Sequence, residues 1–168
     1  RSVEALGFDV LDIAKQEFGS NRKNRGNRLL TVIQYCIDMA LSMSEAIRVC
    51  ENGSRMIYVV GRESTVLGYT FCNSELIYNI GVSIFGLPFL LRQERVFKNR
   101  YGQMIFEDIL HFESLKIKEY PSKEIIIREA RDIAVNMLST KSSIDNKNKS
   151  FLEDAISRAD TINESGVK

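Results

Sequence analysis

One stretch of the sequence joins an apolar run to a polar segment bounded by glycines. The apolar run Met56–Val60 predicts a buried strand. The polar segment that follows supplies the candidate binding residues Gly61, Arg62, Glu63, Ser64 and Gly68. Ligands of open α/β sheets bind beyond the carboxyl ends of parallel strands, so these residues are predicted to form a loop at an active edge. The alternative is an ordinary solvated loop between a strand and a helix.

A second candidate is a basic cluster near the start of the chain. Arg22, Lys23, Arg25 and Arg28 occur with no acidic residue among them. Such a cluster is suited to phosphate contacts, which give affinity for nucleic acid without sequence information. A solvated basic loop is the alternative, and the net charge of the whole chain, only +1, does not decide between them.

The third candidate is a short loop between two β-rich runs. Residues 87–97 and 103–113 predict a β-hairpin whose connection contains Asn99, Arg100 and Tyr101. An aromatic ring in an exposed loop can stack on a nucleic-acid base, and an arginine beside it can contact phosphate. The alternative is that Tyr101 only packs on its neighbours in the hairpin.

The remaining reactive residue types indicate structure and not chemistry. His111, the sole histidine, lies in an apolar strand and is predicted to be a hydrogen-bonded structural residue. Cys36, Cys50 and Cys72 are odd in number, lack metal-type spacing and have apolar neighbours, so they are predicted to be reduced core residues. No metal site is expected, and reduced thiols favour a cytoplasmic location.

The bulk composition is that of a folded, water-soluble domain. With 168 residues and 44% apolar content, the chain can bury a substantial core. The sequence has no apolar run of the ~18 residues that span a bilayer and no secretory leader, so no membrane contact is predicted. The first residue is Arg1 and not Met, and a segment of helical spacing begins almost at once, which suggests that an amino-terminal portion precedes it.

The elements that must position these candidates alternate between helix and strand. Helices are predicted over residues 3–18, 28–50 and 73–86, with Asn73 as the amino-terminal cap of the third. The long helix followed by a strand is typical of the αβ step of a parallel sheet. Two more helices follow residue 121, so the predicted organisation is an α/β domain over residues 1–120 and a helical extension over residues 121–168.

This order of elements, together with four phrases, resembles the carboxyl-terminal half of S-adenosylmethionine-dependent DNA amino-methyltransferases. The phrases are Tyr35-Cys-Ile-Asp-Met39, Glu45-Ala-Ile-Arg-Val-Cys-Glu-Asn-Gly53, Tyr58-Val-Val-Gly-Arg-Glu-Ser-Thr-Val-Leu-Gly68 and Ser74-Glu-Leu-Ile77. The hairpin from Glu94 to Phe112 is similar to the antiparallel pair that closes the family's sheet. The resemblance covers roughly residues 30–113.

The resemblance implies a partial Rossmann-like methyltransferase sheet that ends in an antiparallel hairpin. It also implies a site-specific DNA methyltransferase, of the kind found in restriction–modification systems, that moves a methyl group from S-adenosylmethionine to adenine N6 or cytosine N4. Because these amines are buried in duplex DNA, the target base must be flipped out of the stack. By resemblance, Asn99 and Tyr101 would belong to the target-base pocket, and Arg100 would contact the DNA.

Two signatures of the family are not in this sequence. There is no Gly-rich methyl-donor turn, and Pro88 and Pro121 are the only prolines, so the catalytic Pro-Pro-aromatic turn is missing as well. The opening Arg1-Ser-Val-Glu-Ala-Leu-Gly7 is similar to a phrase that follows this turn in some members. The prediction is therefore a chain with no catalytic residues of its own, whose sheet is completed by an amino-terminal half or a partner chain. The alternatives are a non-catalytic nucleic-acid-binding or assembly subunit and an RNA methyltransferase.

Overall fold

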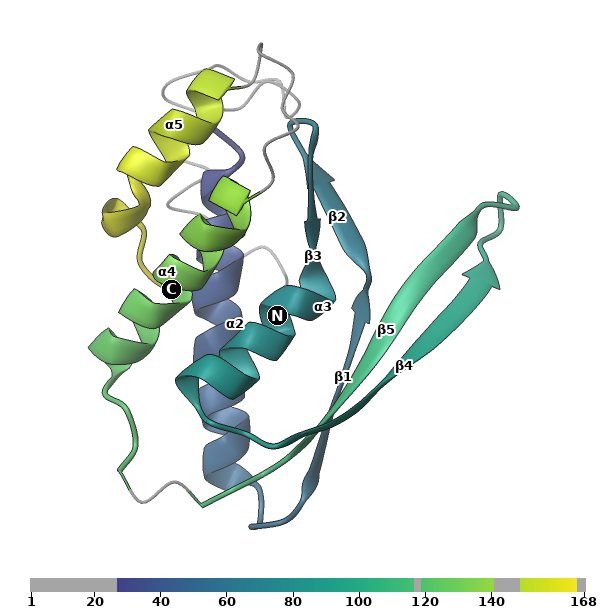
Figure 1. The fold of residues 1–168 in the computed structure, drawn as a ribbon, viewed down its shortest axis with the longest axis vertical. Helices are drawn as coiled ribbons and strands as arrows, with labels where there is room; N and C mark the ends of the chain where they lie inside the picture. The colour runs from purple at the N-terminus through teal and green to yellow at the C-terminus, as the bar shows by residue number, and fades with distance from the viewer. Residues whose placement is uncertain (1–26, 117–118, 141–148, 166–168) are drawn as a thin grey trace.

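The computed structural model describes residues 27–116, 119–140 and 149–165 of the chain. In these residues the fold is mixed α/β: a small antiparallel sheet has α-helices packed against one of its faces (Figure 1). The helix predicted over residues 3–18 and the basic residues Arg22, Lys23 and Arg25 lie outside the described residues.

The first described helix, α2 (Leu30–Val49), confirms the helix predicted over residues 28–50. Its apolar stripe is buried along the whole length, from Leu30 through Ile37 to Ile47. The chain leaves the helix at Cys50 and turns at Gly53, whose φ of 80° is left-handed and therefore favours glycine. The amide of Gly53 donates to the carbonyl of Ser114, 2.7 Å away, and this bond fixes the entry into the next strand.

Three strands form the main sheet, in the order β1 (Arg55–Gly61), β5 (Met104–Glu113) and β4 (Phe89–Lys98). Both outer strands pair with β5 in antiparallel register, so β1 and β4 run parallel to each other with β5 between them. The predicted strand and the predicted hairpin are both confirmed. The αβ step predicted to belong to a parallel sheet leads into a strand whose partner, among the described residues, is the antiparallel β5.

The residues expected to form an open loop after β1 form a hairpin instead. Gly61 is the last residue of β1, Glu63–Val66 form β2, and β2 pairs with β3 (Tyr69–Cys72). Leu67 and Gly68 make the turn with φ values of 51° and 81°, a pair of left-handed residues that matches the twist of a two-residue hairpin. Thr65 and Thr70 lie opposite each other, with their hydroxyl oxygens 2.9 Å apart. Both are β-branched, and β-branched residues favour a strand over a loop.

Helix α3 (Asn73–Asn79) continues directly as a short π-helix, η3 (Ile80–Ile84). Asn73 does not cap it as predicted: its side-chain amide donates to the carbonyl of Gly61 at 2.8 Å and to Ser64 Oγ at 2.9 Å. The side chain therefore ties the helix to the end of β1. Further along, a Cβ on Gly81 would lie 2.7 Å from Phe112, so this glycine allows the helix to approach the sheet.

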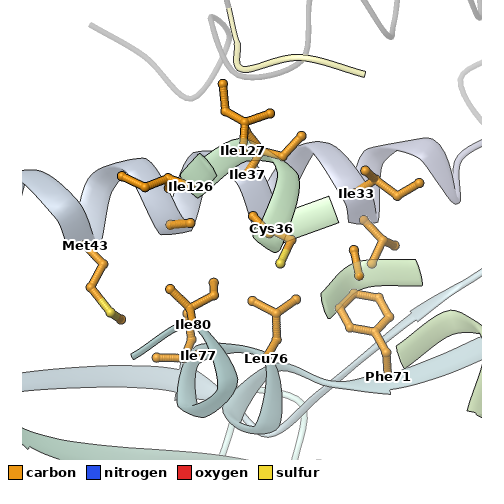
Figure 2. Close-up of a cluster of buried hydrophobic side chains, with 14 of the residues drawn as sticks. Ile33, Cys36, Ile37, Met43, Phe71, Leu76, Ile77, Ile80, Ile126 and Ile127 are labelled. Atoms are coloured by element: carbon orange, nitrogen blue, oxygen red, sulfur yellow. The ribbon is translucent and has the colours of Figure 1, made fainter. Parts of the chain in front are cut away.

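The two helices predicted after residue 121 are α4 (Lys123–Thr140) and α5 (Lys149–Ser157), followed by the 3-10 turn η5 (Ala159–Thr161). Ile126 and Ile127 of α4 belong to the same core as α2 and α3, as Figure 2 shows. The helical extension is thus packed directly on the α/β part of the chain.

Candidate functional site

The β4–β5 hairpin projects beyond the rest of the sheet. β1 ends at Gly61, which lies opposite Glu107, whereas the pairing of β4 with β5 continues to Lys98 and Met104. Residues 95–107 therefore form a two-stranded ribbon, called the ribbon below, that stands away from the helices (Figure 1). Its side chains are largely exposed, including the large apolar ones of Val96, Phe97, Met104 and Phe106. A projecting surface of this kind favours contact with another molecule.

The loop at the end of the ribbon is held by one side chain. Asn99 Oδ1 accepts hydrogen bonds from the amides of Tyr101 at 2.9 Å and Gln103 at 3.0 Å. Gly102 completes the turn with a φ of 77°. Asn99 thus builds the loop that presents Tyr101.

Tyr101 is the most prominent side chain of the ribbon. It is 71% exposed, and the guanidinium carbon of Arg100 lies 4.6 Å from the centre of its ring. Two further arginine–aromatic pairs lie nearby, each at 5.4 Å: Arg95 with Phe97 within the ribbon, and Arg62, which follows β1, with Phe106 of the ribbon. Rings and guanidinium planes of this kind are what exposed bases stack on in proteins that bind single-stranded nucleic acid.

The structure places part of the predicted active edge at the base of the ribbon. Gly61, Arg62 and Glu63 line a hollow of about 470 Å³ together with Met104, Ile105 and Phe106. Ser64 and Gly68 are directed elsewhere: Ser64 bonds to Asn73, and Gly68 lies in the turn between β2 and β3. Three of the five predicted residues are thus brought next to the ribbon.

A buried ion cluster, which the sequence analysis did not identify, holds this region in place. The carboxylate of Asp108 in β5 is fully buried, and Arg62 and Arg92 approach it to 3.1 Å and 2.8 Å. Arg62 also reaches Glu94 on β4 at 2.8 Å. The cluster ties the segment after β1 to both strands of the hairpin, and it sets the position of Arg62 over Phe106.

Electrostatics keeps this buried acid charged. Burial alone raises the pKa of Asp108, but hydrogen bonds from Ser74, Arg62 and Arg92 outweigh burial and hold the pKa below its ordinary value. Arg62 correspondingly has a raised pKa, mainly through its hydrogen bonds to Asp108 and Glu94. Asp108 is therefore an ionised structural residue and not a proton donor at neutral pH.

Of the predicted basic residues, the structure describes Arg28 and Arg100, and these two lie in different parts of the fold. Arg28 is exposed in the turn before α2, and the adjacent Asn27 bonds to Asp154 of α5 at 2.9 Å. Arg28 thus belongs to the helical layer, whereas Arg100 lies at the end of the ribbon.

His111 and Cys36 are buried as predicted, whereas Cys50 and Cys72, also predicted as core residues, are only half-buried. His111 is buried and its Nε2 lies 3.0 Å from Gln93 Oε1. The three cysteines are free thiols, and burial raises the pKa of the Cys36 thiol to about 12. In the part of the chain that the structure describes, no group of histidine, cysteine, aspartate or glutamate side chains could hold a metal ion.

Comparison with known proteins found no relative: the chain matches no protein family, no curated protein and no solved structure. None of the described helices combines the length and the apolar content that crossing a lipid bilayer requires.

Proposed function

We propose that this chain is the carboxyl-terminal, DNA-contacting part of an S-adenosylmethionine-dependent DNA amino-methyltransferase. The observation that carries the proposal is the arrangement of the main sheet. β1 and β4 run parallel, helix α3 lies between them in the sequence, and the antiparallel strand β5 is inserted between them in the sheet. Parallel strands linked through a helix and closed by an antiparallel hairpin are the elements that the sequence resemblance implies for residues 30–113.

The ribbon is the part of the chain that we assign to DNA. Tyr101 is its most exposed aromatic residue, and Arg100 stacks on it. A flipped base needs a flat partner, and its flanking phosphates need cations, so Tyr101 and Arg100 supply the two kinds of contact together. The hollow beside Arg62 lies at the base of the same ribbon and offers space next to an extruded nucleotide. Arg22, Lys23, Arg25 and Arg28 would add phosphate contacts outside the ribbon.

The methyl donor would be bound elsewhere. The family holds S-adenosylmethionine with a Gly-rich turn, whose glycines allow the backbone to approach the cofactor, and this sequence has no such turn. The hollow at Gly61 is walled by Met104, Ile105 and Phe106 and does not supply a substitute. The donor site and the catalytic turn would therefore belong to an amino-terminal half or a partner chain.

The test is a methyl-transfer assay on the complete gene product that contains this chain. We expect labelled methyl groups from S-adenosylmethionine to appear on adenine N6 or cytosine N4 of duplex DNA. Structured RNA of the same sequence serves as the control substrate. Transfer to RNA alone would replace the DNA function by the RNA one, and binding of DNA without any transfer would contradict an enzyme.

That last outcome corresponds to a second candidate, a non-catalytic nucleic-acid-binding or assembly subunit. The specific observation in its favour is that three arginine–aromatic pairs lie on the ribbon or at its base, in a sequence that shows neither the donor-binding nor the catalytic signature. Such a subunit would bind DNA as well as the complete gene product does, and it would not need S-adenosylmethionine.

A further inference from the structure

A second hollow lies beside Arg92, lined by residues of α3, β4 and β5 and by Cys72 at the end of β3. Its volume is about 310 Å³, which lies at the small end of the range for sites that bind small molecules. None of its lining residues belongs to the ribbon or to the hollow at Gly61. This hollow, here called the α3 hollow, is therefore separate from the surface that we assign to DNA.

The apolar walls of the α3 hollow are aromatic and held in place. The rings of Tyr78 and Phe89 meet edge to face, with their centres 5.0 Å apart. Phe89 packs in the same manner on the buried ring of Phe112 at 5.4 Å, and Leu110 completes the wall. Tyr78 is 39% exposed, so part of its side chain is open to solvent. Walls of this kind favour a flat, ring-shaped ligand.

Two charged side chains of the α3 hollow have hydrogen-bonding capacity to spare. The exposed carboxylate of Glu75 forms neither a hydrogen bond nor an ion pair with any of the described residues. The closest contacts of Arg92 with Asp108 and Glu94, at 2.8 Å and 3.7 Å, both go through Nη2. A guanidinium has five N–H donors, so donors of Arg92 remain for a ligand.

The charges around the α3 hollow favour a neutral ligand. In the ion cluster, Arg62 and Arg92 are balanced by Glu94 and Asp108, and Glu75 adds one negative charge beside it. A free anion such as phosphate would therefore meet no excess of positive charge. A simple cation would be attracted by Glu75 but would leave the donors of Arg92 unused. A neutral ring with an acceptor next to its donors satisfies both side chains.

Among the nucleobases, guanine has this pattern on one edge. Its O6 is an acceptor, and the neighbouring N1–H and N2 amine are two donors that point in the same direction. A carboxylate accepts two such hydrogen bonds side by side, and a guanidinium donates to the carbonyl oxygen. Adenine places one donor next to an acceptor, and uracil and thymine place one N–H between two carbonyls, so neither offers a carboxylate two adjacent donors.

We propose that the α3 hollow is a binding site for a guanine base. Glu75 accepts hydrogen bonds from the N1–H and the N2 amine, Arg92 donates to O6, and Tyr78 and Phe89 pack against the ring. A free guanine nucleotide and an unpaired guanine of a nucleic-acid strand offer the same chemistry, and the experiments below separate these two sources. The inference does not depend on the methyltransferase function proposed above.

The test is a calorimetric titration of the 168-residue chain with guanosine, inosine and adenosine monophosphates. Inosine monophosphate keeps O6 and N1–H but lacks the N2 amine, which would donate to the charged Glu75. We therefore expect guanosine monophosphate to bind roughly 10- to 150-fold more tightly than inosine monophosphate, and adenosine monophosphate to bind more weakly still. Equal affinities for the three nucleotides, or no binding of guanosine monophosphate at millimolar concentration, would overturn the proposal.

Variants assign the preference to one side chain. Glu75→Gln has a single acceptor oxygen and should lose the preference for guanosine over inosine monophosphate. Glu51→Gln is the matched control, because it removes the same charge at an exposed position after α2 and should keep the preference. Thermal unfolding shows whether each variant is folded, and Glu75 is exposed, so its substitution should leave the fold intact. A folded Glu75→Gln variant with an unchanged preference would overturn the proposal.

The thiol of Cys72 reports occupancy of the α3 hollow and separates the two sources of guanine. Cys72 lines the hollow and is half-buried, so bound guanosine monophosphate should slow its alkylation by iodoacetamide, whereas the half-buried Cys50 should react as before. A thymine oligonucleotide with one guanine is compared with the same strand without guanine. Half-protection at a lower concentration of the guanine strand than of guanosine monophosphate assigns the site to nucleic acid, and the reverse order assigns it to a free nucleotide. Equal protection by the strand without guanine, or no protection by any ligand, would overturn the proposal.

Discussion

The two ends of strand β5 lie in opposite environments, although they belong to one continuous strand. At its carboxyl end, Leu110 and Phe112 are buried under α3 and η3, with Phe112 in contact with Gly81. At its amino end, Met104 and Phe106 are about half exposed on the ribbon. The residue types are similar, so hydrophobicity alone does not separate core from working surface. The difference is whether a helix covers the strand, and Asp108 stands at the boundary between the two ends.

The largest effect should come from removing this boundary residue. Asp108→Ala leaves Arg62 and Arg92 without their buried partner, and breaking a buried ion pair from one side costs about 3–5 kcal/mol. We expect a loss of this size in the free energy of unfolding, measured by urea denaturation. Glu94→Ala is the matched control, because Glu94 pairs with the same arginines at a 58% exposed position and should cost at most about 1 kcal/mol. Equal losses would mean that the cluster is not a buried one.

The pH dependence of stability sharpens this point. Because the pKa of Asp108 is lowered by folding, its carboxylate contributes stability above the unfolded pKa of about 3.9, and this contribution is lost as the pH falls through the folded pKa. We expect the unfolding free energy of the wild type to fall below about pH 4 more steeply than that of Asp108→Asn, which has no proton to gain. Parallel curves for the two proteins would contradict an ionised Asp108 in the folded state.

A smaller effect is expected at the covered end of the strand. The Cβ of Gly81→Ala would approach Phe112 to 2.7 Å in a closed part of the core, and such overpacking costs about 1–3 kcal/mol. Alanine regains roughly 1 kcal/mol through its helix propensity, so the net loss should be up to about 2 kcal/mol. Thermal unfolding measures the loss of stability. Gly61→Ala is the control variant, because nothing lies within 4 Å of a Cβ at that position. A stabilised Gly81→Ala variant would mean that η3 does not pack closely on the sheet.

Elements with long periodic patterns could be predicted from the sequence, and elements fixed by contacts between distant residues could not. The stripe of α2, the apolar run of β1 and the two runs of the β4–β5 hairpin each carry their own signal. The short strands β2 and β3 have four residues each, too few for a clear period, and a charged segment between glycines is equally typical of a loop. Asn73 was predicted as a cap from its type alone, but its side chain bonds to Gly61, twelve residues earlier.

The same distinction applies to the candidate site: residues with a local sequence signal could be predicted, and residues brought together by the fold could not. Tyr101 and Arg100 could be identified because a short loop between two strands is exposed almost by necessity. The cluster around Asp108 could not, because Arg62 and Asp108 are 46 residues apart and only the sheet register brings them together. The exposed face of β1 was hidden as well, because the continuous apolar run of Met56–Val60 predicted burial on both faces, whereas Ile57 and Val59 are exposed on one of them.

The most direct test of the account is the affinity of the 168-residue chain for duplex DNA, compared between wild type, Tyr101→Ala and Tyr101→Phe at one fixed salt concentration. Stacking on a base contributes about 1–3 kcal/mol, so Tyr101→Ala should bind roughly 5- to 150-fold more weakly, whereas Tyr101→Phe keeps the ring and should bind like the wild type. The stability of both variants should stay within about 0.5 kcal/mol of the wild type, because Tyr101 lies at the exposed end of the ribbon. Equal affinity of Tyr101→Ala and wild type, with the fold intact, would contradict the assignment of the ribbon to DNA.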